Sequence, residues 1–166
     1  MNSRFNPHWN SATASSSVAP APIRTAGRCD SAQRLALQQA RFRSGVYGGV
    51  DVSGKTVPLV PEVLATAGVS WTYAARSRVN LSLRHVGRQR FDNDQANAFP
   101  RKMPAYTLAD AKLEHALARR WELALEVRNL FDKRYFSYAA ETGPNTFSAL
   151  PAPGRAAYAS VAWRLD

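Results

Sequence analysis

The chain ends in the stretch Arg155-Ala-Ala-Tyr-Ala-Ser-Val-Ala-Trp-Arg-Leu-Asp166. Apolar residues alternate here with a set that includes a phenol, a hydroxyl and a guanidinium: Ala157, Ala159, Val161, Trp163 and Leu165 against Tyr158, Ser160, Ala162 and Arg164. Because successive side chains of a strand point to opposite faces, the pattern predicts a strand with one apolar and one polar face. Such a strand is typical of a barrel wall between lipid and a watery lumen.

The same alternation recurs upstream, most cleanly over residues 121–128, and predicts further strands over 63–73, 79–91 and 106–117. The connections also alternate in length. Those near 74–78 and 118–120 are short, whereas those near 44–61, 92–105 and 139–154 are long and rich in Gly, Pro, Asn and Asp. Short turns at one end and long loops at the other are typical of an outer-membrane barrel, and a soluble sandwich has less reason to separate them.

Strand length and aromatic placement agree with a membrane wall. About eleven residues at ~3.3 Å each, tilted by ~45°, span roughly 25 Å, the apolar height of such a barrel. Aromatic residues fall near the expected strand ends, where interfacial girdles lie: Trp71, Tyr73, Phe91, Tyr106, Trp121 and Trp163.

Composition excludes several other classes. The chain of 166 residues is 45% hydrophobic and carries a net charge of +10, yet it has no helix-turn-helix, zinc-finger or RNP-type motif, so we expect no nucleic-acid partner. A lone Cys29 and separated histidines at 8, 85 and 115 predict neither a disulfide framework nor a metal site. No Gly-rich phosphate loop, nucleophile elbow or HExxH motif appears, so we predict no enzyme activity and no cofactor.

The N-terminal part has a different texture. Residues 1–28 show no periodicity and are expected to be irregular. Asp30 or Ser31 is a suitable cap for a short helix over 30–42. The sequence thus predicts an irregular or partly helical segment over 1–40 and strands over 41–166.

Three motifs in the second part carry a resemblance. Asn129-Leu130-Phe131-Asp132-Lys-Arg-Tyr135 resembles the NLFDxxY segment of TonB-dependent outer-membrane receptors. Pro153-Gly154-Arg155, followed by the terminal strand, resembles their C-terminal signature. The stretch Phe99-Pro-Arg-Lys-Met-Pro-Ala-Tyr-Thr-Leu-Ala-Asp110 is similar to the loop and strand before the NLFD segment in siderophore-receptor members.

This resemblance, over residues 41–166, implies an all-β fold. The chain would be an antiparallel up-and-down meander of about five to six strands from the C-terminal part of a transmembrane β-barrel. It further implies a parent receptor in the outer membrane that imports a scarce ligand, with a ferric siderophore as the expected cargo. Residues 1–40 match neither plug, TonB box nor export signal, so the chain alone is not expected to transport.

Roles for single residues follow from the same resemblance. Val161, Trp163 and Leu165 resemble the signal by which barrel assembly machinery recognises a terminal strand, although family members end in an aromatic residue and this chain ends in Leu165-Asp166. Asn129 and Asp132 are expected to satisfy backbone donors at a bulge, Gly154 to permit the turn into the last strand, and Arg155 to meet carboxylates.

The expected partners and one rival function complete the predictions. Outer-membrane lipid and lipopolysaccharide would contact the wall, and the TonB system would act only through a plug. A candidate cation patch for an anionic siderophore or lipopolysaccharide phosphate lies near the presumed outer end: Arg88, Arg90, Arg101 and Lys102. The rival is a small soluble basic β protein that binds an acidic partner.

Overall fold

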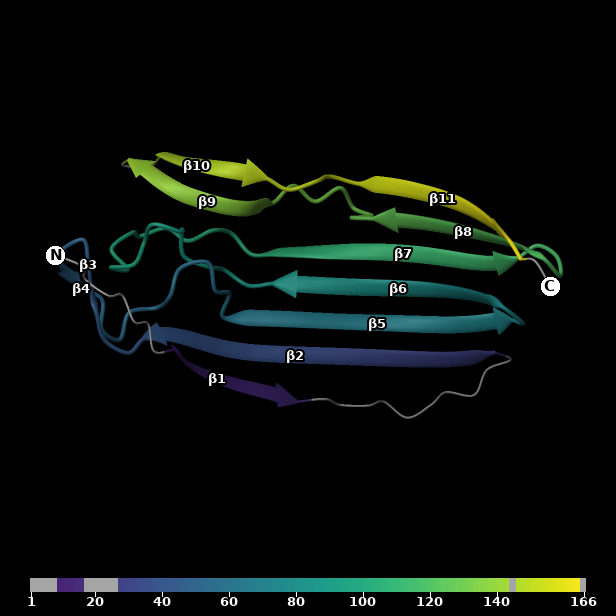
Figure 1. Ribbon diagram of the computed structural model, residues 1–166, viewed down its shortest axis with the longest axis horizontal. Coiled ribbons are helices and arrows are strands. Elements are labelled where there is room, and N and C mark those ends of the chain that lie inside the picture. The colour runs from purple at the N-terminus through teal and green to yellow at the C-terminus, as the bar shows by residue number, and fades with distance from the viewer. Residues whose placement is uncertain (1–8, 17–26, 144–145, 165–166) are drawn as a thin grey trace.

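The computed structural model describes residues 9–16, 27–143 and 146–164, and of 9–16 only the backbone. These residues form an antiparallel sheet of seven strands in the order β1-β2-β5-β6-β7-β8-β11, with two separate hairpins, β3–β4 and β9–β10 (Figure 1). No helix in the described part is long and apolar enough to cross a membrane. The strands are β1 Trp9–Ser16, β2 Arg28–Phe42, β3 Val46–Tyr47, β4 Val50–Asp51, β5 Val63–Ala74, β6 Ser77–Val86, β7 Tyr106–Ala116, β8 Trp121–Arg128, β9 Phe136–Gly143, β10 Thr146–Pro151 and β11 Ala156–Trp163.

The connections between these strands separate by length, as the sequence predicts. The links of β5 to β6 and of β7 to β8 are short and lie at one end, called here the turn end. Three long connections, 43–62, 87–105 and 129–155, lie together at the opposite loop end (Figure 1). The all-β, up-and-down prediction is therefore confirmed, and β1 and β2 add two strands to the five that residues 63–163 contribute to the main sheet.

The helix predicted over 30–42 is wrong, because these residues form β2, which pairs with β5 from Arg28 opposite Thr72 to Leu37 opposite Val63. The Ala, Leu and Gln residues of this segment have good helix propensity, but a helix would bury few of them, whereas strand pairing satisfies the whole backbone. The irregular segment predicted over 1–28 is wrong at 9–16, which form β1 beside β2. Residues 1–8 and 17–26 lie outside the described part.

The strand register divides the side chains of the sheet between two faces. Val69 pairs with Leu81, Leu81 with Ala111 and Leu113 with Leu125, so these apolar residues share one face across four strands. The apolar face comprises Leu35, Leu37, Ala65, Ala67, Val69, Trp71, Val79, Leu81, Leu83, Ala109, Ala111, Leu113, Leu123, Leu125, Val127, Ala159, Val161 and Trp163.

The opposite, polar face carries most of the charged side chains of the strands. Its members include Arg78, Asn80, Ser82, Arg84, Asp110, Lys112, Glu114, Glu122, Glu126, Arg128, Ser160 and Arg164. The two faces therefore differ in the way that a wall between hydrocarbon and water requires.

The two clusters of buried apolar residues lie at the loop end. One cluster joins Phe42, Val52 and Val57, and a second joins Phe91, Met103 and Ala139. By contrast, large residues of the apolar face stay open, with Leu81 51% and Val161 59% exposed. Within the described residues no second layer covers this face, and only isolated apolar side chains would normally be left so open on a soluble protein.

The two edges of the main sheet are open in the described part of the chain. β1 pairs only with β2 and β11 only with β8, so the sheet does not close on itself. Figure 1 shows both edge strands at the outside of one curved layer. A wall of this shape needs further strands at both edges before it becomes a barrel.

Candidate functional site

The NLFD motif forms the bend where β8 leaves the sheet. Asn129 and Asp132 both have φ of +51°, a left-handed conformation that Asn and Asp tolerate better than most residues. The Asn129 side chain makes the two hydrogen bonds that a backbone amide would make: Oδ1 accepts from the Lys133 amide at 2.8 Å, and Nδ2 donates to the Lys133 carbonyl at 3.0 Å. Asn129 is only 4% exposed, so these bonds satisfy an amide that water does not reach.

The bend is tied to both neighbouring strands. The Asn129 amide donates to Asp110 Oδ1 on β7 at 2.8 Å, and the Leu130 amide donates to the Ala109 carbonyl at 2.7 Å. The Tyr135 ring lies 4.3 Å, centroid to centroid, from the Tyr106 ring at the start of β7. Asp110 and Tyr106 thus belong to the motif in space, and their distance along the chain concealed this in the sequence.

Asp132 connects the bend to the start of β11. Its Oδ1 accepts from the Arg155 amide at 2.9 Å, so the carboxylate satisfies a backbone donor as predicted. A Cβ on Gly154 would lie 2.9 Å from the same oxygen. The residue is therefore a glycine because of this close approach and not because of a positive φ. The Arg155 side chain is exposed and has no carboxylate partner among the described residues.

The other motif residues are less enclosed. The Pro153 carbonyl lies 3.5 Å from Asn129 Nδ2, and Leu130 and Phe131 lie outside the strands. Phe131 is 76% exposed. These positions favour a structural role for the motif as the joint of β7, β8 and β11.

The terminal strand presents its apolar residues outward. Val161 and Trp163 lie on the apolar face, opposite Leu123 and Trp121. The Trp163 and Trp121 rings are 6.3 Å apart and form one aromatic pair at the turn end, and Trp71 and Tyr73 form a second pair there on β5; together they are called the turn-end aromatic group. Leu165, the third residue of the predicted assembly signal, lies outside the described residues.

Two of the four predicted loop cations are engaged in ion pairs, and two are exposed. Arg90 forms an ion pair with buried Asp94 at 2.6 Å, and Lys102 forms one with Glu62 at 3.0 Å. Arg88 and Arg101 are exposed and have no ion pair among the described residues.

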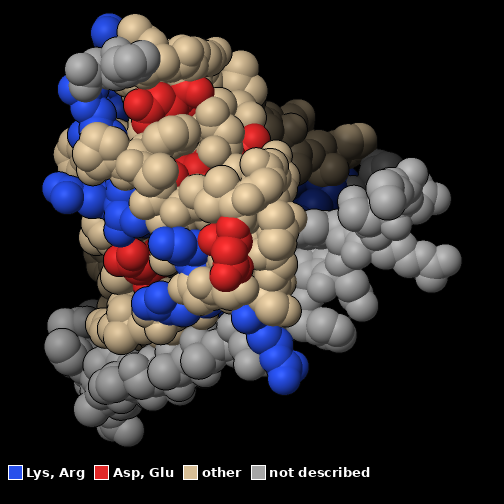
Figure 2. Space-filling view, turned by 90° about the vertical axis from the view of Figure 1, so that its left-hand side faces the viewer, with Lys and Arg blue, Asp and Glu red and all other residues tan. Residues whose placement is uncertain are grey.

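The loop end carries charges of both signs. The three long connections contain nine basic and six acidic residues. Figure 2 shows this end of the molecule, where Lys and Arg side chains alternate with Asp and Glu. Arg90 is engaged internally, because it pairs with the buried Asp94. The basic excess of the connections therefore comes from their other basic residues, at the surface.

A second charged group lies on the polar face at the turn end. Glu114 pairs with Arg78 and Lys112, and Glu122 pairs with Arg164 at 2.8 Å and with Arg76 at 3.6 Å. All of these residues except Lys112 line a hollow of about 240 Å³. Both carboxylates of this group are therefore balanced by cations.

The two histidines of the described strands, His85 and His115, lie on the apolar face opposite Ala65 and Leu123. No group of three or more His, Cys, Asp or Glu side chains within the described ranges is placed to hold a metal ion. His115 instead stacks on Tyr73, with its Nδ1 2.8 Å from the Tyr73 hydroxyl, and His85 Nδ1 lies 2.9 Å from Thr107 Oγ1.

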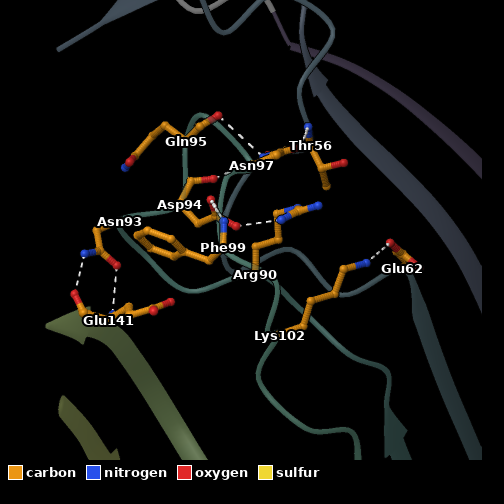
Figure 3. A network of polar contacts seen from close by, with 10 residues as sticks. All are labelled: Thr56, Glu62, Arg90, Asn93, Asp94, Gln95, Asn97, Phe99, Lys102 and Glu141. Atoms are coloured by element: carbon orange, nitrogen blue, oxygen red, sulfur yellow. Dashed lines mark hydrogen bonds and ion pairs between the residues drawn. The ribbon is translucent and has the colours of Figure 1, made fainter. Parts of the chain in front are cut away.

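A loop network that the sequence did not predict lies beside the cations. Asn97 and Asn93 make hydrogen bonds to the two other long connections, and Asp94 bonds within its own connection between them (Figure 3). From the sequence, this Asp- and Asn-rich stretch indicated only a polar loop. The only sequence feature that points to the network is the high number of Asp and Asn residues in this stretch, because their side chains can replace backbone groups as hydrogen-bond partners.

Comparisons with known proteins agree with this architecture. The family model described as TonB dependent receptor-like, beta-barrel, matches residues 9–130. That match includes β1 and β2, over which the motifs quoted above do not extend. No curated protein sequence matches the chain.

Solved structures share the fold at low identity. The ferric-catecholate import receptor Fiu of Escherichia coli K12, in its closed form, is 24% identical with a TM-score of 0.68, over 93% of this chain and 20% of that one. The siderophore receptor PiuA of Acinetobacter baumannii is 22% identical with a TM-score of 0.64, over 81% of this chain and 19% of that one. The ferric yersiniabactin uptake receptor FyuA of Yersinia pestis is 21% identical with a TM-score of 0.61, over 92% of this chain and 26% of that one.

The chain thus spans about a fifth to a quarter of the length of these receptors. Its strand order, the division between apolar and polar faces and the family match over most of its length lead to one assignment. The chain belongs to the TonB-dependent receptor-like β-barrel family.

Proposed function

We propose that the chain forms part of the wall and outer loops of a TonB-dependent receptor in the outer membrane, which imports a ferric siderophore. The observation that carries the proposal is the register-aligned apolar face, which runs from β2 to β11 without a covering layer in the described part. In an outer-membrane barrel this face lies against hydrocarbon, and the polar face lines the lumen. A soluble protein with this sheet would leave the same residues in water.

The ends of the sheet support one orientation. Two aromatic pairs, Trp71 with Tyr73 and Trp121 with Trp163, lie at the turn end, and aromatic residues favour the boundary between lipid and water. Outer-membrane barrels place short turns on the periplasmic side and long loops outside. The three long connections would therefore face the exterior and meet the ligand first.

The ligand class is proposed from the loops and from the relatives. Arg88 and Arg101 are exposed without an ion pair in the described residues, and cations there would attract an anionic ferric complex. The comparison structures include receptors whose names specify ferric catecholate and ferric yersiniabactin. In the proposed mechanism the loops capture the complex, and energy delivered through TonB rearranges a plug so that the complex passes.

The same proposal names the remaining partners. Lipid and lipopolysaccharide would contact the apolar face and the exposed cations above it. Barrel assembly machinery would recognise β11, where Val161 and Trp163 alternate with polar residues. The TonB system would act on the plug rather than on this part of the wall.

Fluorescence quenching tests the membrane placement. In a receptor that carries this chain, reconstituted with brominated lipid, single-Trp variants that keep Trp71, Trp121 or Trp163 should be quenched strongly by bromine and weakly by aqueous iodide. A matched variant with its only Trp at Ala124, on the polar face, should show the reverse order. Strong iodide quenching at all four positions would favour the soluble alternative.

A further inference from the structure

The middle of the 87–105 connection is bonded to both other long connections. We call residues 90–103 the central segment; it lies between the 43–62 connection and strand β9 (Figure 3). Because β9 and β10 are one hairpin inside the 129–155 connection, contacts with β9 join the third connection as well. The contacts on the two sides use different residues.

On the side of the 43–62 connection, Asn97 pairs with Thr56 as a backbone would. The Thr56 amide donates to Asn97 Oδ1 at 2.7 Å, and Asn97 Nδ2 donates to the Thr56 carbonyl at 2.8 Å. Nearby, the Leu59 amide donates to the Arg90 carbonyl at 3.1 Å. These three bonds, with the Lys102–Glu62 ion pair, hold the first connection to the central segment.

On the side of β9, Asn93 pairs with the backbone of Glu141 through the same two kinds of hydrogen bond. Its Nδ2 donates to the Glu141 carbonyl at 2.7 Å, and the Glu141 amide donates to its Oδ1 at 3.0 Å. The Tyr138 hydroxyl donates to Asp92 Oδ2 at 2.7 Å, and this hydrogen bond raises the pKa of the phenol above its ordinary value. This hydrogen bond thus favours the protonated form of the phenol, which is the form that donates to Asp92.

Asp94 lies between these two sides and is 1% exposed. Its Oδ2 accepts from Arg90 Nη1 at 2.6 Å, and its Oδ1 accepts from the Phe99 amide at 3.2 Å. Its backbone carbonyl accepts from the Asn97 amide at 3.1 Å, which closes the turn that positions Asn97. A buried carboxylate is stable only while such partners remain, so the fold of the central segment depends on Asp94.

We infer that the central segment holds the three long connections together as one body that moves as a unit, and that this assembly depends on Asp94. This inference rests on the proposed function only for its consequence: the incoming ligand would meet a preassembled surface rather than independent flexible lids. It also assigns the Asn93 and Asn97 side chains separate roles as the two joints.

Hydrogen exchange measured by mass spectrometry tests this in the membrane-assembled receptor that carries the chain. Asp94→Ala should raise exchange about tenfold or more in the central segment, at 54–60 and at 138–143, a factor equal to about 1.4 kcal/mol. Asn97→Ala should raise exchange at 54–60 and not at 138–143, and Asn93→Ala should do the opposite. Asp51→Ala is the matched control, because Asp51 bonds only to Ser53 among the described residues and should affect only its own turn.

Two results would overturn the inference. One is faster exchange confined to 90–103 after Asp94→Ala, which would mean that the connections are held independently. The other is equal effects of Asn93→Ala and Asn97→Ala on both sides. Amides of β6 and β7 serve as an internal reference, since their protection reports a folded sheet whether or not the protein lies in a membrane, and so separates a failure here from a failure of the proposed function.

Discussion

Placing a charge at Leu125 probes the apolar face at its most sensitive depth. Leu125 lies on β8 opposite Leu113 and Ala159 and is 38% exposed. It is four residues from Trp121 of the turn-end aromatic group, which corresponds to about 13 Å along a strand and about 9 Å in depth at a tilt of ~45°. Half of the apolar height of such a barrel is about 12 Å, so Leu125 is expected close to the bilayer midplane.

At that depth Leu125→Arg should lower the free energy of unfolding by about 2–3 kcal/mol, because the guanidinium enters hydrocarbon. Ala124→Arg is the matched control. Ala124 is adjacent to Leu125 on the same strand, but it lies on the polar face, opposite Glu114 and Ser160, where water can solvate the new charge. The control should change stability by less than about 1 kcal/mol.

The assay is a denaturant titration of the receptor folded into lipid vesicles, followed by intrinsic tryptophan fluorescence. Unfolding free energies are compared among the parent, Leu125→Arg and Ala124→Arg at one lipid composition. Equal losses for the two variants would refute the assignment of the faces. A larger loss for Ala124→Arg would invert it.

Three further predictions follow from particular contacts. Gly154→Ala should lower the free energy of unfolding by about 1–3 kcal/mol, because its Cβ would press on Asp132 Oδ1. Gly68→Ala should cost less, because its Cβ would meet the Leu81 carbonyl at an ordinary 3.6 Å. Equal shifts of the two variants in thermal unfolding would contradict this. Arg88→Glu combined with Arg101→Glu should weaken binding of an anionic ferric complex by about tenfold at low salt and less at high salt, while Arg119→Glu at the turn end should not. Ligand titration at two ionic strengths measures this, and equal effects of the double variant and of Arg119→Glu would contradict the prediction. The 166-residue chain expressed alone should not form a heat-modifiable barrel, because β1 and β11 each leave an edge that no described strand pairs with, and unpaired backbone groups cost several kcal/mol each in lipid. A heat-dependent shift on a cold gel would show the opposite.

Strand alternation and loop lengths made most of the sheet predictable from the sequence. Each of the predicted strands from residue 63 onward has a period-2 pattern, and period 2 fixes which residues share a face once the strands pair. Asn129 and Asp132 could also be assigned a role, because an amide and a carboxylate beside a break in the alternation indicate local satisfaction of backbone groups.

The failures have physical causes as well. β2 was predicted as a helix because Ala, Leu and Gln favour helices locally, and only pairing with β5, far along the chain, decides otherwise. The loop network was missed because Asn97 with Thr56 and Asn93 with Glu141 are 41 and 48 residues apart. Likewise, Arg90 and Lys102 resembled free cations, since nothing in the sequence shows that Asp94 is buried or that Glu62 lies within 3.0 Å of Lys102.

The most direct test of the membrane wall is nitroxide labelling of paired positions in the assembled receptor. Labels at Leu81, Leu123 and Val161 should collide often with oxygen dissolved in the bilayer and rarely with a water-soluble nickel complex. Labels at Ser82, Ala124 and Ser160 should give the reverse ratio. Free access of the nickel complex to all six labels would contradict the account, because the apolar face would then lie in water.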